Sequence, residues 1–134
     1  MEEFYYRKLE VYKRAKQLSH EVCKVLKTYP IDERFGLCDQ LRRAVMSVPI
    51  NIAEGFGRFS AKEKAHFIQI AYGSLNEVMC EFELSFDENY ISEEQFLFFE
   101  EQIKPLRRQL SALHKSLLEN GDFNPQQPPN PNNP

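Results

Sequence analysis

The stretch RRAVMSVPINIAEGFGRFS, residues 42–60, decides the fold. Its apolar residues recur at steps of three and four, which is the spacing of one face of an α-helix. Pro49 lies inside this repeat, where a proline removes one backbone hydrogen bond and its ring clashes with the carbonyl of Val45. We therefore predict a helix over residues 35–54 that continues through Pro49 with a kink. We also predict that the freed carbonyl of Val45 needs another partner.

Three further segments share the helical period and predict helices over residues 5–28, 61–88 and 93–119. Two of them begin with a capping-box signature, Ser60 with Glu63 and Ser92 with Gln95, which satisfies free amides at a helix start. The connections between the four segments are short, so neighbouring helices must be antiparallel. The sequence therefore predicts an all-α fold, an antiparallel up-down four-helix bundle over residues 1–120.

The composition changes abruptly after the predicted helix stop at Asn120-Gly121. Residues 121–134 are almost entirely Pro, Asn and Gln, so they cannot bury apolar surface. We predict a disordered or polyproline-like C-terminal tail. Two interpretations stay open for it: an idle tail, or a segment that docks on an aromatic groove.

Charge is distributed unevenly along a chain whose net charge is only −3. Residues 1–64 hold 13 Lys or Arg against 9 Asp or Glu, whereas residues 65–104 hold 9 acidic residues against one lysine. A mild net charge argues against a dedicated, strongly basic nucleic-acid binder. The split is compatible with RNA binding by the basic half, with head-to-tail self-association, or with two solvated faces.

A polar stripe runs beside the apolar face of the Pro49 segment, and its members step by three and four: Arg43, Ser47, Asn51, Glu54 and Arg58. Gly73 and Glu77 lie one turn apart in the next segment, and a glycine inside a helix costs about 1 kcal/mol against alanine. We therefore expect Gly73 to mark a close approach of another helix or subunit.

The stripe has two interpretations. In the first it is a hydrogen-bonded interface, with Arg43 or Arg58 pairing Glu54 or Glu77. In the second it contacts phosphate or RNA through Arg42, Arg43, Arg58, Lys62 and Lys64. Interleaved carboxylates would repel phosphate, which favours the interface.

No catalytic or cofactor-binding pattern is found. Glu63 and His66 form a single Glu-x-x-His, whereas di-iron bundles need two such pairs and two further glutamates. A metal-dependent enzyme is therefore only a remote alternative, and we predict no cofactor, metal or catalytic residue. The three cysteines form no CxxC pair and are expected to be small buried thiols in a reducing cytosol. No secretory signal or run of about 20 apolar residues is present, so we predict a cytoplasmic protein without membrane contact.

Four segments together resemble the four-helix-bundle family of 23S ribosomal-RNA intervening-sequence proteins: LEVYKRAKQL, DERFGLCDQLRRAVMSVPINIAEGFGRFS, FIQIAYGSLNE and YISEE. The resemblance extends from Leu9 to about Leu118. The motif positions matched are Arg42, Arg43, Pro49, Asn51, Glu54, Gly55, Gly73 and Glu77.

This resemblance implies a bacterial, cytoplasmic homopentamer without a catalytic centre. Related accessory proteins of diversity-generating retroelements form ring-shaped pentamers that bind a reverse transcriptase and its RNA. By this resemblance the expected role is an assembly or RNA-associated accessory factor, with direct RNA binding by the basic half as the alternative. The retroelement relatives are markedly basic, whereas this chain is acidic, and the Pro/Asn-rich tail is not part of the family pattern.

Overall fold

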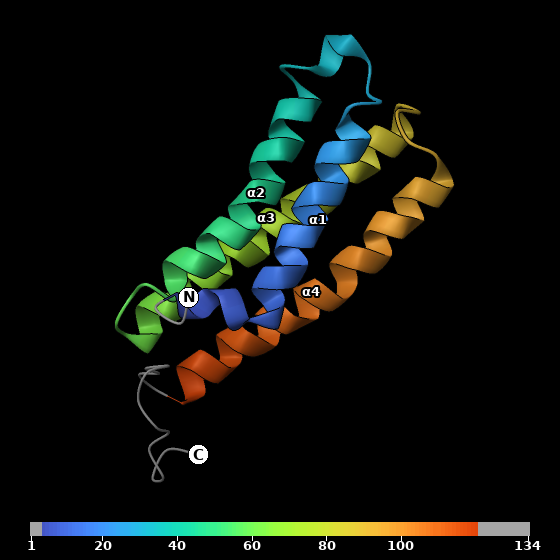
Figure 1. The fold of residues 1–134 in the computed structure, drawn as a ribbon. Helices are drawn as coiled ribbons and strands as arrows, with labels where there is room; N and C mark the ends of the chain where they lie inside the picture. Colours follow the sequence, from blue (N-terminus) through green and yellow to red (C-terminus); the bar gives the residue numbers. More distant parts are fainter. Residues whose placement is uncertain (1–3, 121–134) are drawn as a thin grey trace.

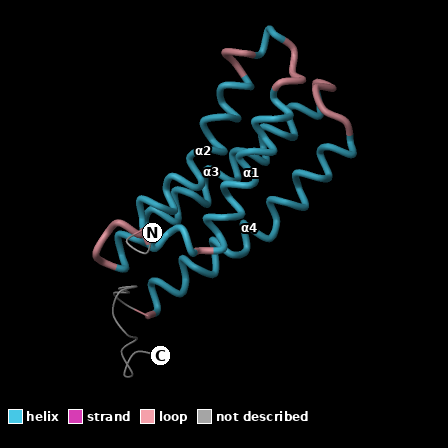
Figure 2. Tube along the Cα trace, in the orientation of Figure 1, coloured by secondary structure: helices cyan, strands magenta, loops and turns pink. Residues whose placement is uncertain are grey.

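The computed structural model describes residues 4–120, and four long helices make up most of this range: α1 (Glu10–Leu26), α2 (Leu37–Gly55), α3 (Ala61–Asp87) and α4 (Glu93–Glu119). Two short 3-10 helices precede α1 and α2, namely η1 (Tyr5–Lys8) and η2 (Ile31–Glu33). No strand occurs within residues 4–120. Successive helices run in opposite directions and are joined by short loops at alternating ends (Figures 1 and 2). The prediction of an all-α, up-down four-helix bundle is confirmed.

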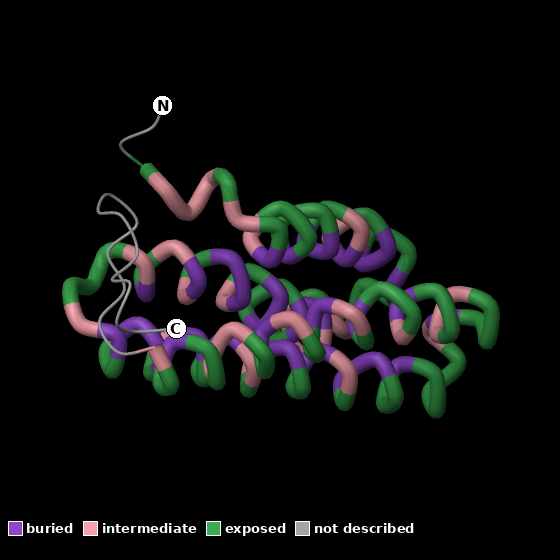
Figure 3. The backbone as a smooth tube through the Cα atoms, turned by 90° about the horizontal axis from the view of Figure 1, so that it is seen from below, coloured by how far each residue is buried: buried purple, intermediate pink, exposed green. Residues whose placement is uncertain are grey.

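The core lies where the apolar stripes of the four helices meet, and their buried sides face one another in Figure 3. Its largest fully buried side chains are Phe82, Leu41, Ile52, Ile68, Leu75, Leu106 and Leu110. α3 packs along both α2 and α4, whereas α1 packs mainly along α2. The rings of Phe82 and Phe99 stack with their centroids 4.3 Å apart, which joins α3 to α4.

The first helix differs from the prediction at its N-terminal end. A single helix over residues 5–28 was expected, but Leu9 has extended backbone angles (φ −72°, ψ 130°) and separates η1 from α1. This break turns η1 aside, so that the ring of Tyr5 lies 6.0 Å from that of Phe56 just after α2. Aromatic packing against α2 thus accompanies the loss of one continuous helix.

The predicted capping box is complete at the start of α4, whereas at the start of α3 one half of it is recorded. Ser60 Oγ accepts a hydrogen bond from the Glu63 amide at 3.1 Å. At Ser92 both halves of the capping box are present, because Ser92 Oγ accepts from the Gln95 amide and Gln95 Oε1 accepts from the Ser92 amide. The predicted tail over residues 121–134, and Gly121 of the helix stop, lie outside the described residues.

All three cysteines were expected to be buried, but the structure buries only one of them. Cys38 is buried, Cys23 is half-buried and Cys80 is exposed. Cys80 follows Val78 by two residues, or about 200° around the helix, which turns it away from the core.

None of the helices within residues 4–120 is long and apolar enough to cross a membrane.

Candidate interface along helices α2 and α3

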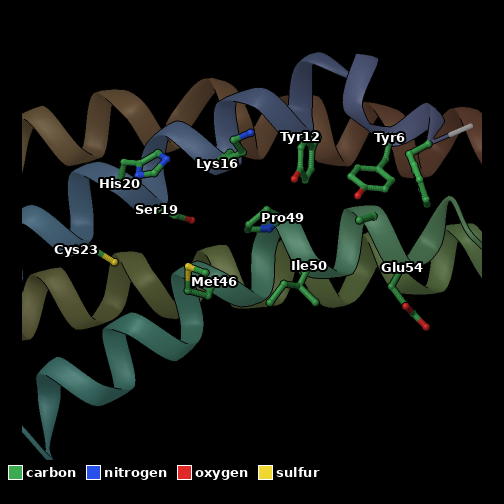
Figure 4. Close-up of a pocket in the computed structure, with 12 residues that line it drawn as sticks. Tyr6, Tyr12, Lys16, Ser19, His20, Cys23, Met46, Pro49, Ile50 and Glu54 are labelled. Atoms are coloured by element: carbon green, nitrogen blue, oxygen red, sulfur yellow. The ribbon is translucent and has the colours of Figure 1, made fainter. Parts of the chain in front are cut away.

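Pro49 lies within an unbroken α2, and the carbonyl that it frees has a partner from another helix. Ser19 Oγ on α1 lies 3.2 Å from the carbonyl oxygen of Val45 and 3.0 Å from that of Ala15. A hydroxyl carries one proton, so Ser19 shares it between the two carbonyls. Figure 4 shows Ser19 extending toward α2 beside Pro49, where the ribbon of α2 changes direction. The predicted need for a substitute partner is confirmed.

The uncharged members of the polar stripe join α2 to α3. Ser47 Oγ lies 2.8 Å from Ser74 Oγ. Asn51 Nδ2 donates to the carbonyl oxygen and the hydroxyl of Ser47, both at 2.8 Å. All three side chains are half-buried, so the stripe contributes a hydrogen-bonded seam at the boundary of two helices. Sequence analysis missed Ser74, the α3 member of this seam.

The charged members pair within α2 and its end rather than across to α3. Arg58 Nη2 lies 2.8 Å from Glu54 Oε1, which confirms one predicted pair. Arg43 instead pairs with Asp39 at 3.2 Å, so of the predicted alternatives the one observed is Arg58 with Glu54. Asp39 is one turn away on the same face, whereas Glu54 is three turns further along, about 16 Å.

Glycine marks a close helix approach at a different place from the one expected. A Cβ added at Gly73 would meet nothing within 4 Å, so within the described chain no helix packs there and that part of the prediction is wrong. A Cβ added at Gly55 would lie 3.0 Å from Phe67 Cβ and 3.2 Å from the carbonyl oxygen of Lys64. The tight contact of α2 with α3 is therefore at Gly55, where the two helices meet beside their loop.

Lys64 is buried, and its ammonium donates to the carbonyl oxygen of Arg58. It thereby stabilises the loop between α2 and α3 and is not on an exposed basic surface, so its predicted phosphate contact is wrong. The sequence held a signal for this burial. Lys64 occupies a step of the same three- and four-residue pattern as Ala61 and Ile68, a position that faces the core.

Glu81 is a second buried charged residue that sequence analysis missed. It lies three residues after Val78, on the core side of α3, and only 4% of it is exposed. Burial, followed by the hydrogen bond and the charge of Glu77, raises the pKa of Glu81 to about 8. Glu81 Oε2 has no hydrogen-bond partner within the described part of the chain. Glu77 thus interacts with another carboxyl group, and Glu54 is the acidic residue that pairs with an arginine of the stripe.

Next to Glu81, a short chain of hydrogen bonds joins the end of α1 to α3. The Tyr29 hydroxyl donates to Ser85 Oγ at 2.7 Å, and Ser85 donates to the backbone carbonyl of Glu81 at 2.8 Å. Burial raises the pKa of Tyr29 to about 12. The hydroxyl therefore stays protonated and acts as a structural donor.

The next feature is the Glu63 and His66 pair, which was considered as part of a metal site. In residues 4–120 no three His, Cys, Asp or Glu residues gather to hold a metal ion. Glu63 and His66 are exposed and line a surface depression with Arg58, Lys62 and Phe67. They remain a pair on the surface of α3.

A groove with a volume of about 890 Å³ opens between η1, α1 and α2 (Figure 4). The α1 side carries Tyr12, Ser19 and Cys23, and the α2 side carries Pro49 and Ile50. Sequence analysis did not locate this groove, because α1 and η1 were expected to form one straight helix.

Among the comparisons with known proteins, the match to a family profile identifies the family. The sequence profile of the 23S rRNA-intervening sequence protein family matches residues 7–112. A search of curated proteins finds no match. Among solved structures, the chain is similar to a protein of unknown function from the S23 ribosomal protein family of Bacteroides thetaiotaomicron VPI-5482. The two share 21% sequence identity with a TM-score of 0.73, over 78% of this chain and 95% of that one, which shows the shared fold.

Proposed function

Because the chain belongs to the 23S rRNA-intervening sequence protein family, we propose that it is a non-enzymatic accessory protein that self-assembles. In this proposal it forms a homopentamer in the bacterial cytoplasm and serves as an assembly or RNA-associated factor. The surface that carries the proposal is the α2–α3 face, which we define by its residues: Ser47, Asn51, Ile70, Gly73, Ser74 and Glu77.

Gly73 is the single observation that supports this face most strongly. It is exposed and has open space around it, so it has no packing role inside one protomer. A glycine in the middle of a helix nevertheless costs about 1 kcal/mol relative to alanine. Ile70, one turn before it on the same side of α3, is 38% exposed. A second copy whose backbone approaches Gly73 and covers Ile70 would account for both features.

The polar side chains of the face are compatible with burial. Ser47, Asn51 and Ser74 already bond to one another, so a partner could cover their hydroxyl and amide donors provided that it supplies a donor to Asn51 Oδ1. The nearby arginines Arg43 and Arg58 are paired with carboxylates, which reduces their attraction for phosphate. Both points favour a protein partner over RNA at this face.

The test compares two exposed isoleucines. Ile70→Arg places a charge on the α2–α3 face, whereas Ile31→Arg is a matched control in η2, where the side chain is 76% exposed. Sedimentation velocity should show Ile70→Arg shifted to a smaller species and Ile31→Arg unchanged, with equal helix content by circular dichroism. Full assembly of Ile70→Arg would remove this face from the proposal.

Direct RNA binding is a second candidate, supported by a separate basic and aromatic surface on η1 and α1. A depression there is lined by Tyr6, Arg7, Tyr12, Lys13 and Lys16, together with Gln17 and His20. The Lys16 ammonium lies 5.7 Å from the centre of the Tyr12 ring. Aromatic rings that stack bases beside cations that contact phosphates are typical of single-strand binding.

A titration with single-stranded RNA at two salt concentrations tests this candidate. If this surface makes three phosphate contacts, the logarithm of the binding constant should fall with the logarithm of the salt concentration with a slope of about −2. Lys13→Ala with Lys16→Ala should weaken binding, whereas Lys24→Ala with Lys27→Ala, at the other end of α1, should not. Absence of binding at low salt would exclude direct RNA binding by this surface. An equal loss from Arg42→Ala with Arg43→Ala would shift the contact to α2.

A further inference from the structure

We propose that residues 125–131 dock as a polyproline II helix in the groove between α1 and α2 of their own chain. This is the groove described above, which lies between η1, α1 and α2 and has a volume of about 890 Å³. The occupant is the proline-rich segment of sequence PQQPPNP, which lies outside the described residues.

The walls of the groove have the composition that polyproline helices bind. Phe4, Tyr6 and Tyr12 form one end, and the rings of Tyr6 and Tyr12 meet edge to face with centroids 4.8 Å apart. Across from them, Pro49 and Ile50 contribute apolar surface, and Ile50 is 59% exposed. Proline-rich segments characteristically dock in aromatic-lined grooves of this kind.

The spacing of the prolines matches the period of a polyproline II helix. Pro125, Pro128, Pro131 and Pro134 recur every three residues, and this helix has three residues per turn. In that conformation the rings of Pro125, Pro128 and Pro131, two turns in all, would form one continuous apolar edge along the groove. Residues 123–134 carry no charged side chain, so the segment suits a largely apolar groove better than a polar surface.

The C-terminal end of α4 lies at a position from which the proline-rich segment could reach the groove. α4 ends at Glu119, at the same end of the bundle as η1 (Figure 1). Tyr6 of η1 is part of the aromatic end of the groove. Residues 120–124 connect α4 to Pro125 and span up to about 17 Å when extended. This length exceeds the diameter of one helix, about 10–12 Å, so the linker is long enough to pass across one helix. The groove extends from Tyr12 to Cys23 along α1, also about 17 Å. That length takes nearly two polyproline turns of about 9 Å each.

Cys23 gives a direct readout of occupancy, because it is half-buried and lines the groove (Figure 4). Its alkylation by a maleimide is followed by mass spectrometry, with exposed Cys80 on α3 as the reference within the same molecule. Removal of residues 121–134 should accelerate alkylation of Cys23 by about tenfold, since a short tether gives an effective concentration in the millimolar range. The rate at Cys80 should not change.

Matched tail variants separate docking from the mere presence of a tail. Replacement of Pro125, Pro128 and Pro131 by alanine should accelerate Cys23 alkylation as truncation does. Replacement of Gln126, Gln127 and Asn130 by alanine should preserve protection. A synthetic peptide of residues 121–134, added at millimolar concentration to the truncated protein, should restore it.

Two outcomes would overturn the proposal. Equal Cys23 rates in the full and truncated chains would show that the groove is open in both. Protection that disappears when the full chain is diluted from 100 to about 1 μM would assign the bound segment to a second copy. Protection that is unchanged by dilution supports docking within one chain.

Discussion

The hydrogen bond from Ser19 to the Val45 carbonyl predicts an energetic coupling between Ser19 and Pro49. Ser19→Ala removes the partner that α1 provides, and Pro49 has no amide to replace it. An unpaired buried carbonyl costs about 1–3 kcal/mol. Because Ser19 lines the groove, water can reach part of this site, so we expect a loss of about 1–2 kcal/mol in the free energy of unfolding.

Pro49→Ala restores an amide that can donate to Val45 within α2, so the carbonyl no longer depends on Ser19. In this background Ser19→Ala should cost at most about 0.5 kcal/mol, which leaves a coupling energy of about 1 kcal/mol. Urea unfolding followed by circular dichroism measures all four proteins at one protein concentration, with the m-value as a check. Ser111→Ala, an exposed serine on α4, is the matched control and should change stability by less than about 0.5 kcal/mol in either background. Equal costs of Ser19→Ala with and without Pro49 would refute the reasoning.

Two glycines and one glutamate give the remaining predictions. Gly55→Ala should destabilise the protein by about 1–3 kcal/mol in urea unfolding, because its Cβ would press on Phe67 and on the backbone of α3. Gly73→Ala should stabilise the dissociated protomer by up to about 1 kcal/mol, because the added Cβ would lie in open space. If Gly73→Ala destabilised the protein and Gly55→Ala stabilised it, the packing described would be contradicted. Since the folded pKa of Glu81 is raised from 4.5 to about 8, the folded state binds more protons between these values. Stability should therefore fall as pH rises from about 5 to 8, by at least about 1 kcal/mol, and Glu81→Gln should flatten this dependence; identical pH profiles would exclude Glu81 as its source.

The sequence predicted what depends on local periodicity. The apolar steps around Pro49 were enough to predict a helix that continues through it, because the core contacts of that helix outweigh one missing bond. They were also enough to predict that the Val45 carbonyl needs a partner. They could not identify Ser19, which lies 26 residues earlier and meets Val45 only after α1 and α2 pack.

The candidate site was predicted less well, since it depends on distances between helices. A helical wheel shows which face Gly55 and Gly73 occupy but not where two backbones approach, so the close contact of α2 with α3 at Gly55 was not predicted. Lys64 and Glu81 are different, because both lie at core-facing steps of the α3 pattern and a closer reading would have predicted their burial. The break at Leu9, and with it the groove, depends on aromatic packing against the end of α2 that no local pattern shows.

The central claim is that the chain assembles into a homopentamer, and light scattering coupled to size-exclusion chromatography tests it most directly. The protein at micromolar concentration should elute with the mass of five 15.8 kDa chains, about 79 kDa. A mass of 15.8 kDa would show a monomer and contradict the account.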